Sequence, residues 1–191
     1  MDRIRNAFAA ALMALALLGL LALSSIPALA EERVCRGTIG AATVDNLRVP
    51  QNATCTLNRT RVKGTIKIGS NATLRAYDVI VIGNVQGENA RLVVVAEGSR
   101  VGGSVQVVQG GGATVSDSNV NGDILYDDNR NTLRVLRNDV GGNVQVFQNT
   151  GGVEIRRNVI DGNLQCKENQ PRPVGGRNVV GGNKEDQCSR L

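Results

Sequence analysis

Apolar and polar residues recur along this chain with a period of 19 or 20 residues. The most regular element is V-x-G-x-[V/I/L], which first occurs as Val62-Lys-Gly64-Thr-Ile66 and begins again at residues 81, 101, 120, 140, 160 and 180. A fixed period of this length is typical of a solenoid, because each repeat is one coil that can bury its apolar face only against its neighbours. The pattern therefore predicts an architecture before any single residue suggests a function.

The apolar positions within each coil alternate with polar ones, which indicates β-strands with one buried face. With the first apolar residue of each element as position 0, positions 0, +4 and +6 are mostly apolar and define one strand. Counting backward places Thr43 at position 0 of a degenerate first coil, with Asn46–Val49 on its strand. A second strand is predicted from an apolar pair at −7 and −5, namely Cys55/Leu57, Leu74/Ala76, Val94/Ala96, Ala113/Val115, Leu133/Val135 and Val153/Ile155.

We therefore predict an all-β, single-domain parallel β-helix of about seven coils of 19–20 residues, and we expect a right-handed coil. Every strand is expected to pair with its counterpart one coil away, and the Gly, Asn, Asp and Ser residues beyond the second strands are expected to form turns. Aromatic residues make up only 2% of the chain. An ordinary globular core depends on large rings, whereas stacked Val, Ile and Leu can fill a narrow coil interior.

Residues 1–30 have the organisation of a secretory signal peptide. A short basic start is followed by an apolar run from Ala9 to Leu23, and Ala28-Leu29-Ala30 supplies the small-x-small pattern that signal peptidase needs. The alternative is a membrane anchor that stays in place, but the apolar run is near the lower limit for spanning a bilayer. We therefore expect a secreted or periplasmic protein, whose single domain spans residues 31–191 without a further transmembrane segment.

Four cysteines lie in two pairs, one near each end of the repeat region. Cys35 and Cys55 are 20 residues apart and Cys166 and Cys188 are 22 apart, which is about one coil in each case. Four cysteines allow three connectivities, and the spacing favours disulfides Cys35–Cys55 and Cys166–Cys188 that staple the two ends. Each bond would contribute about 3 kcal/mol in the chain-entropy model, and export favours oxidation. A zinc site is disfavoured, because the chain has no His and no C-x-x-C.

Outward positions repeat as well, and they are the first candidates for binding. Amides recur in three columns, of which the one at +5 is interrupted by Leu125. The columns contain Gln86, Gln106, Gln145 and Gln165 at +5, Asn84, Ser104, Asp123, Asn143, Asn163 and Asn183 at +3, and Asn138, Asn158 and Asn178 at −2. Stacked amides can hydrogen-bond along the axis at the strand spacing. A structural role is therefore the preferred interpretation, and polymer binding by the Gln column is the alternative.

Three arginines, Arg137, Arg157 and Arg177, align at position −3 of successive coils. Such an Arg stripe is a candidate site for an anionic group such as a uronate, a teichoate or a lipid phosphate. We expect no nucleic-acid partner. The preferred interpretation of the stripe is a solvated basic edge that prevents aggregation.

The last coil has Lys184 and Asp186 where earlier coils have apolar residues at +4 and +6. A polar terminal coil is the usual way in which a repeat protein ends its stack. The repeat region, residues 43–183, resembles the bactofilins through its V-x-G-x-[V/I] coil pattern. Bactofilins are bacterial β-helix proteins that polymerise end to end in the cytoplasm or on the inner face of the membrane. The leader, the cysteine pairs and the polar last coil argue against such filaments here.

The tail is similar to the ending of a group of secreted bacterial β-helix proteins that have no known activity. The similarity is carried by the sequences GNLQCKENQP at residues 162–171 and GGRNVVGGNKEDQC at residues 175–188. It implies the fold and export, and it brings no catalytic residues to this chain.

Three functions from different classes are compatible with these features. The preferred one is an exported structural or surface protein of the cell envelope or the medium, in which the stiff rod itself is the function. The second is a module that binds an anionic or polyhydroxylated extracellular polysaccharide through the Arg stripe or the Gln column. Few aromatic residues stand at outward positions, which disfavours this module because sugars commonly stack on rings.

The third function, a minimal carbohydrate-active enzyme, is disfavoured by the absence of the groups that such chemistry needs. We find no convergent pair of carboxylates, no His base, no nucleophile motif and no phosphate-binding loop. The acidic run Asp127-Asp128-Asn129 fits a turn, and the adjacent Arg130 argues against calcium binding there. We therefore expect no catalysis, no cofactor and no metal.

The leader and the cysteine pairing can be tested together by intact-mass measurement of the exported protein. We expect the mass of residues 31–191 with both disulfides formed. Four free thiols after export would contradict the proposed stapling of the two ends, and a mass that includes residues 1–30 would indicate a retained anchor.

Overall fold

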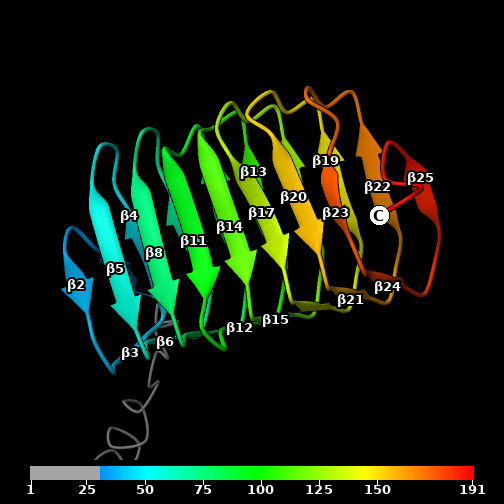
Figure 1. Ribbon diagram of the computed structural model, residues 1–191. Coiled ribbons are helices and arrows are strands. Elements are labelled where there is room, and N and C mark those ends of the chain that lie inside the picture. Colours follow the sequence, from blue (N-terminus) through cyan, green and yellow to red (C-terminus); the bar gives the residue numbers. More distant parts are fainter. Residues whose placement is uncertain (1–30) are drawn as a thin grey trace, which may run out of the picture.

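The computed structural model describes residues 31–191, and these residues form one all-β solenoid without a helix. About seven turns stack along one axis, so that the first strands lie at one end of the rod and the C-terminus lies at the other (Figure 1). The prediction of a parallel β-helix is confirmed. The signal peptide predicted for residues 1–30 lies outside the described residues.

Three parallel sheets form the sides of the coil. Sheet A contains nine strands: β1 (Glu32–Val34), β4 (Asn46–Val49), β7 (Ile66–Ile68), β10 (Val85–Glu88), β13 (Val105–Val108), β16 (Ile124–Asp127), β19 (Val144–Phe147), β22 (Leu164–Lys167) and β25 (Lys184–Asp186). Sheet B contains eight: β2 (Thr38–Ile39), β5 (Thr54–Asn58), β8 (Thr73–Tyr77), β11 (Leu92–Ala96), β14 (Gly112–Ser116), β17 (Leu133–Leu136), β20 (Val153–Arg156) and β23 (Val174–Gly176). Sheet C contains eight: β3 (Thr43–Val44), β6 (Arg61–Val62), β9 (Ile80–Val81), β12 (Arg100–Val101), β15 (Asn119–Val120), β18 (Asp139–Val140), β21 (Val159–Ile160) and β24 (Val179–Val180).

Each coil therefore contains one strand of each sheet, where the sequence pattern predicted two strands in total. In one coil Val62 ends β6, Lys63 and Gly64 form a bend, and Ile66 begins β7. The apolar residues on both sides of this bend are buried. The alternation of buried and exposed positions therefore continues across the bend, so that β6 and β7 have the sequence pattern of a single strand.

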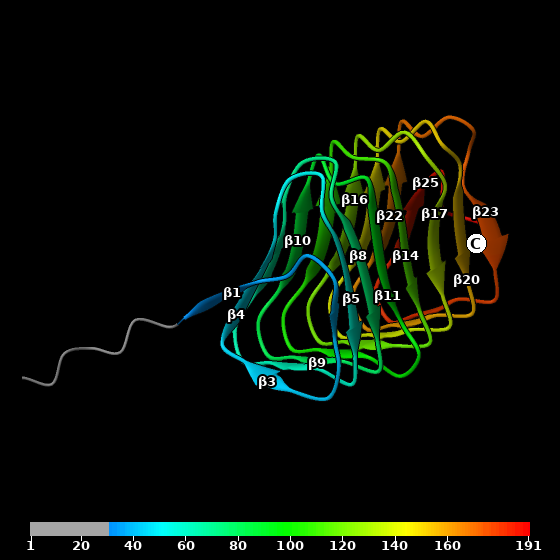
Figure 2. The same ribbon diagram turned by 90° about the vertical axis from the view of Figure 1, so that its left-hand side faces the viewer.

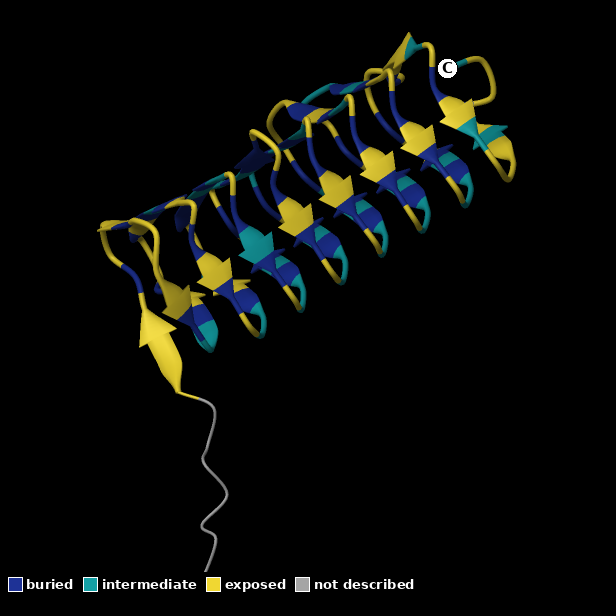
Figure 3. Ribbon diagram, turned by 90° about the horizontal axis from the view of Figure 1, so that it is seen from below, coloured by how far each residue is buried: buried dark blue, intermediate teal, exposed yellow. Residues whose placement is uncertain are grey.

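The strands pair with their counterparts in the next coil, so identical positions form columns along the rod. Val85 of β10 is in register with Ile66 on one side and Val105 on the other, and the 0 position repeats in the same way in sheet C. Figure 2 shows the coils following one another with a common outline. In Figure 3 the short strands of sheet C lie side by side, with an outward residue followed by a buried one in most of them. The stacked apolar columns form the core.

One predicted apolar pair is displaced by one residue. In β11 the inward pair is Val93 and Val95, and the prediction of Val94/Ala96 is wrong. The corner that follows β11 is one residue longer than the corner that follows β8. Counting back from position 0 therefore arrives one residue late, and a shift of one residue exchanges the two faces of a strand.

The first coil shows the opposite displacement. Val44 is buried and pairs with Val62, so it occupies position 0 in place of the predicted Thr43. Only Asp45 separates β3 from β4, whereas residues 63–65 separate β6 from β7. The strand predicted over Asn46–Val49 is confirmed as β4.

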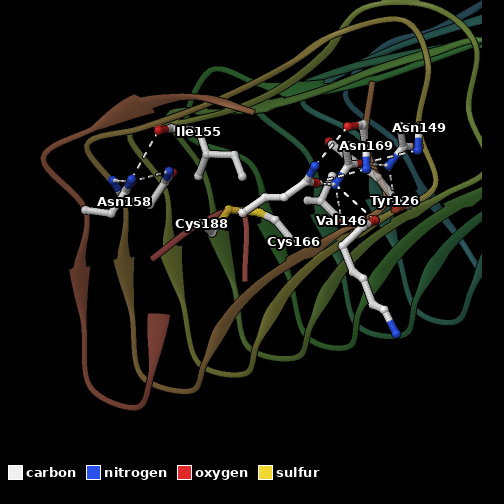
Figure 4. The surroundings of a disulfide bond; sticks show 11 residues. Tyr126, Val146, Asn149, Ile155, Asn158, Cys166, Asn169 and Cys188 are labelled. Atoms are coloured by element: carbon white, nitrogen blue, oxygen red, sulfur yellow. Dashed lines mark hydrogen bonds between the residues drawn. A yellow bond between two sulfur atoms is a disulfide. The ribbon is translucent and has the colours of Figure 1, made fainter. Parts of the chain in front are cut away.

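Both predicted disulfides are confirmed. The Cα atoms of Cys35 and Cys55 are 5.5 Å apart, and those of Cys166 and Cys188 are 5.2 Å apart. All four residues are buried, and Figure 4 shows the second bond among the last coils of the rod. A terminal coil has a neighbour on one side only, so these cross-links restrain the coils that would otherwise open most easily.

The glycine at +2 recurs because neighbouring coils approach closely at the bend between sheets C and A. A Cβ atom on Gly142 would lie 2.8 Å from the carbonyl carbon and 2.9 Å from the carbonyl oxygen of Gly122 in the preceding coil. A Cβ atom on Gly162 would lie 2.7 Å from the carbonyl oxygen of Gly142. The close approach of two backbones, and not a positive φ, is what requires glycine in this column.

Replacing Gly142 with Val should therefore destabilise the rod. Atoms forced into a packed site cost about 1–3 kcal/mol through backbone shifts, and thermal unfolding followed by circular dichroism would measure the loss. Gly37→Val is the matched control, because a Cβ atom on Gly37 meets no atom within 4 Å. Equal melting temperatures for the two variants would show that the glycine column is incidental.

Candidate functional site

The predicted glutamine column lies on the outer face of sheet A. Gln86 and Gln106 are in register on β10 and β13, and Gln145 and Gln165 are in register on β19 and β22. The Nε2 of Gln86 donates to Oε1 of Gln106 over 3.3 Å, and the Nε2 of Gln145 donates to Oε1 of Gln165 over 2.9 Å. Leu125 lies between Gln106 and Gln145 in the same column. The structure therefore contains two short amide ladders in place of one continuous ladder.

A second outward column runs beside the first, two residues further along each strand. It contains Glu88, Val108, Asp127, Phe147 and Lys167, in this order along the rod. Shallow depressions follow this face, and one of them is lined by Asp127, Phe147, Gln148, Lys167 and Glu168. We call this surface the Phe147 face. It consists of the outward residues of β16, β19 and β22 and of the adjoining corner residues Asp128, Gln148 and Glu168. The outward residues are Leu125, Asp127, Gln145, Phe147, Gln165 and Lys167.

The Phe147 face cannot be recognised from the repeat alone, because its outward residues at position +7 do not recur from coil to coil. Position +7 follows the inward position +6, so alternation alone places Phe147 outward, next to Gln145 on the same strand. Tyr77 is likewise half-buried on the outer side of sheet B, whereas Tyr126 is buried in the core. Two of the three aromatic residues among residues 31–191, Phe147 and Tyr77, therefore lie outward.

Asp127 carries an unusual carboxylate for an outward position. Its Oδ1 is shielded from solvent and accepts no hydrogen bond from any residue in the described range 31–191. Burial raises the pKa of Asp127, and the neighbouring charge of Asp128 raises it further. Phe147 is the residue in register with Asp127 in the next coil. Because Oδ1 is shielded, an external donor could pair with it only after a rotation of the Asp127 side chain.

The three predicted arginines lie along one corner of the rod, between sheets B and C. Arg137, Arg157 and Arg177 all have a positive φ, of 54°, 58° and 59°. Arg137 forms a bidentate ion pair with Asp117. Its Nε and Nη2 donate to the two carboxylate oxygens of Asp117 over 2.6 and 2.8 Å. This hydrogen bonding lowers the pKa of Asp117.

Arg157 and Arg177 are exposed, and neither has a carboxylate within 4.0 Å among residues 31–191. The predicted Arg stripe therefore retains two unpaired guanidinium groups on adjacent coils. Arg137, the third, belongs to an exposed ion pair.

The predicted asparagines at −2 form a buried ladder inside this same corner. The Oδ1 of Asn158 accepts from the backbone N–H of Asn138 over 2.9 Å, and Asn178 accepts from Asn158 over 3.0 Å. Each Nδ2 also donates to a backbone carbonyl of the preceding coil, as Asn158 does to Val135 over 2.8 Å. The polar groups of these side chains are hydrogen-bonded inside the fold, which supports a structural role for them.

A second buried ladder, of Asn129, Asn149 and Asn169, fills the corner between sheets A and B (Figure 4). Its last step is to Gln187, whose Oε1 accepts from the backbone N–H of Asn169 over 2.9 Å. This ladder was not predicted from the sequence, although its members recur every 20 residues. Asn129, which the sequence places in a turn, is a buried residue of this ladder.

The side chains at +3 link neighbouring coils at the third corner, between sheets C and A. Each accepts a hydrogen bond from the backbone N–H of its counterpart in the next coil, in seven successive steps from Asn46 to Asn183. Asn, Thr, Ser and Asp all serve here because the position needs only a short side-chain oxygen. All three corners of the coil are therefore tied along the axis by side chains as well as by the sheets.

The described residues contain no cluster of three or more His, Cys, Asp or Glu side chains that could hold a metal ion. Within residues 31–191 there is also no helix long and apolar enough to cross a membrane. No protein-family model, no curated protein and no solved structure matched the chain. The candidate sites thus rest on their own geometry, which singles out the Phe147 face and the pair Arg157 and Arg177.

Replacing Asn149 with Ala should strongly destabilise the rod. The side chain of Asn149 accepts from the backbone N–H of Asn129 and donates to the carbonyl of Tyr126, so its loss leaves both groups buried without these partners. We expect a loss of about 3 kcal/mol, measured by chemical denaturation. Asn119→Ala, at an exposed position, should change stability by less than about 0.5 kcal/mol. A similar small effect for both variants would show that the ladder is dispensable.

Proposed function

We propose that this protein is an exported structural rod of the cell envelope or the extracellular medium, whose stiff and resistant surface is its function. The observation that carries the proposal is the unbroken ladder at +3 from the first full coil to the last, with a disulfide at each end. Few segments of residues 31–191 can open without breaking bonds to two neighbours. The proposal includes no catalytic step.

Both disulfides are buried and support an oxidising compartment, in agreement with the leader inferred for residues 1–30. In such a compartment a chain meets proteases and variable solution conditions without assistance from ATP-dependent chaperones. A fold in which backbone amides are paired between coils, and in which the corners are tied by buried amides, is suited to that exposure.

A second candidate function is polymer binding, and one observation favours it. The rod presents outward groups in rows with a spacing of about 4.8 Å per coil, which matches an extended polymer better than a compact ligand. The two unpaired arginines would bind anionic groups, and the glutamine ladders would bind hydroxyl groups. An envelope polymer or an extracellular polysaccharide is the corresponding partner.

The structural function can be separated from polymer binding by genetic complementation in the organism that exports the chain. Deletion should weaken the envelope, measured as sensitivity to detergent. A variant in which Arg157 and Arg177 are Ala should restore resistance, because it keeps the rod. Gly142→Val should fail, because it disturbs the stacking.

A second surface variant, with Gln145 and Gln165 replaced by Ala, should also restore resistance if the rod alone is needed. Both surface variants must be exported at the wild-type level and must melt near the wild-type temperature. Folded surface variants that fail to complement would contradict the structural proposal and would favour polymer binding.

A further inference from the structure

Phe147 is the only phenylalanine among residues 31–191, and it lies on the outer surface of the rod. Its strand β19 buries Val144 and Val146 and turns Gln145 and Phe147 outward, where both are half-buried. An aromatic ring on this side contributes nothing to the core. The ring stands between Asp127 on one side and Lys167 on the other, which are its partners in register.

The polar groups around the ring are held in place by one another. The Nε2 of Gln145 donates to Gln165, and the Nε2 of Gln165 donates to a carboxylate oxygen of Glu185 over 2.8 Å. At the adjoining corner the Nε2 of Gln148 donates to Glu168 over 3.1 Å. These bonds fix the orientation of three amides, so that little side-chain entropy remains to be lost on binding.

Two acceptor groups on this face are available to a ligand. The Oε1 of half-buried Gln145 accepts no hydrogen bond within residues 31–191, and the half-buried Asp127 carboxylate has no ion-pair partner there, although its Oδ1 is shielded. Oriented amides and carboxylates that flank an outward, half-buried ring can accept from hydroxyl groups while the accessible part of the ring covers an apolar sugar face. Because the groups stand on strands of a rigid sheet, their spacing is fixed before a ligand arrives.

From these observations we propose that the Phe147 face binds a neutral, hydroxyl-rich glycan chain, with Phe147 as the stacking platform and Gln145, Gln165 and Asp127 as hydrogen-bonding groups. This inference goes beyond the structural rod, which requires no ligand. It also assigns a ligand class and a position to the second candidate function.

The local charge favours a neutral glycan over an anionic one. Asp127, Asp128 and Glu168 contribute carboxylates to the face, and Glu185 lies in register with Gln165. Lys167 is the basic residue among them, and its Nζ lies 3.8 Å from Glu168. The face is thus acidic although the whole chain has a formal net charge of +5. It would repel uronates and phosphates, which the distant Arg157 and Arg177 would attract.

The first experiment measures binding of soluble hexasaccharides to residues 31–191 by two-dimensional NMR and calorimetry, at low and at high salt. The neutral probes are cellohexaose and N-acetylchitohexaose, the anionic probe is a galacturonate hexamer, and the cationic probe is a glucosamine hexamer. We expect at least one neutral probe to bind equally at both salt concentrations, and to perturb the amides of β16, β19 and β22.

Substitutions then locate the site. Phe147→Ala should weaken binding of the neutral probe about tenfold, since an aromatic contact contributes up to about 1.5 kcal/mol. Leu136→Ala is the matched control, because Leu136 is a half-buried outward residue on sheet B, and it should leave binding unchanged. Both variants should melt near the wild-type temperature, because neither side chain is in the core.

Three outcomes would overturn the proposal. They are the absence of binding by either neutral probe, wild-type affinity in a folded Phe147→Ala variant, and binding only of a charged probe that is lost at high salt. None of these results bears on envelope resistance in the complementation assay, so the structural function and the glycan site fail or succeed separately.

Discussion

Hydrogen bonding along the rod axis is the constraint on which the rest of this structure depends. Every strand of residues 31–191 pairs with the strand one coil away, so no coil is complete by itself. The bends between strands carry N–H and C=O groups that also need partners when they are buried. The side-chain ladders at all three corners supply these partners, and glycine at +2 lets the backbones approach closely enough. A single repeat length satisfies sheets, corners and core together.

The same constraint explains the two ends, where one neighbour is missing. Arg33 of β1 and Lys184 of β25 occupy the inward column that Leu47 and Leu164 fill inside the rod. A second rod stacked on either end would have to bury these charges without water, which is costly unless they are paired. Charged end positions therefore make such stacking costly, and the expectation that end-to-end polymerisation is doubtful stays a prediction.

Much of the fold could be predicted from the sequence because columns of a solenoid repeat in register. The core positions, the glycine column and both cysteine pairs followed directly from the period of 19 or 20 residues. The corners could not be predicted as well, since one residue more or less in a bend leaves the strands intact but shifts the count, as at Val93 and Val44. The third sheet was missed because alternation continues across the bend. Ion pairing, such as that of Arg137 with Asp117, depends on side-chain conformations, which the recurrence of a residue type in the sequence does not give.

The candidate site could not be predicted for a related reason. Positions that stacking constrains recur in every coil, whereas outward positions that stacking does not constrain show no pattern. Inward and corner residues are constrained by the neighbouring coils, whereas an outward residue in a strand need only be compatible with its surroundings. Leu125 interrupts a glutamine column, and Phe147 places a ring where burial offers it little. A half-buried apolar group gains only part of the favourable transfer free energy that a core position would give it. A ligand-binding site would therefore lie at such departures from the repeat, whereas the regular columns stabilise the fold.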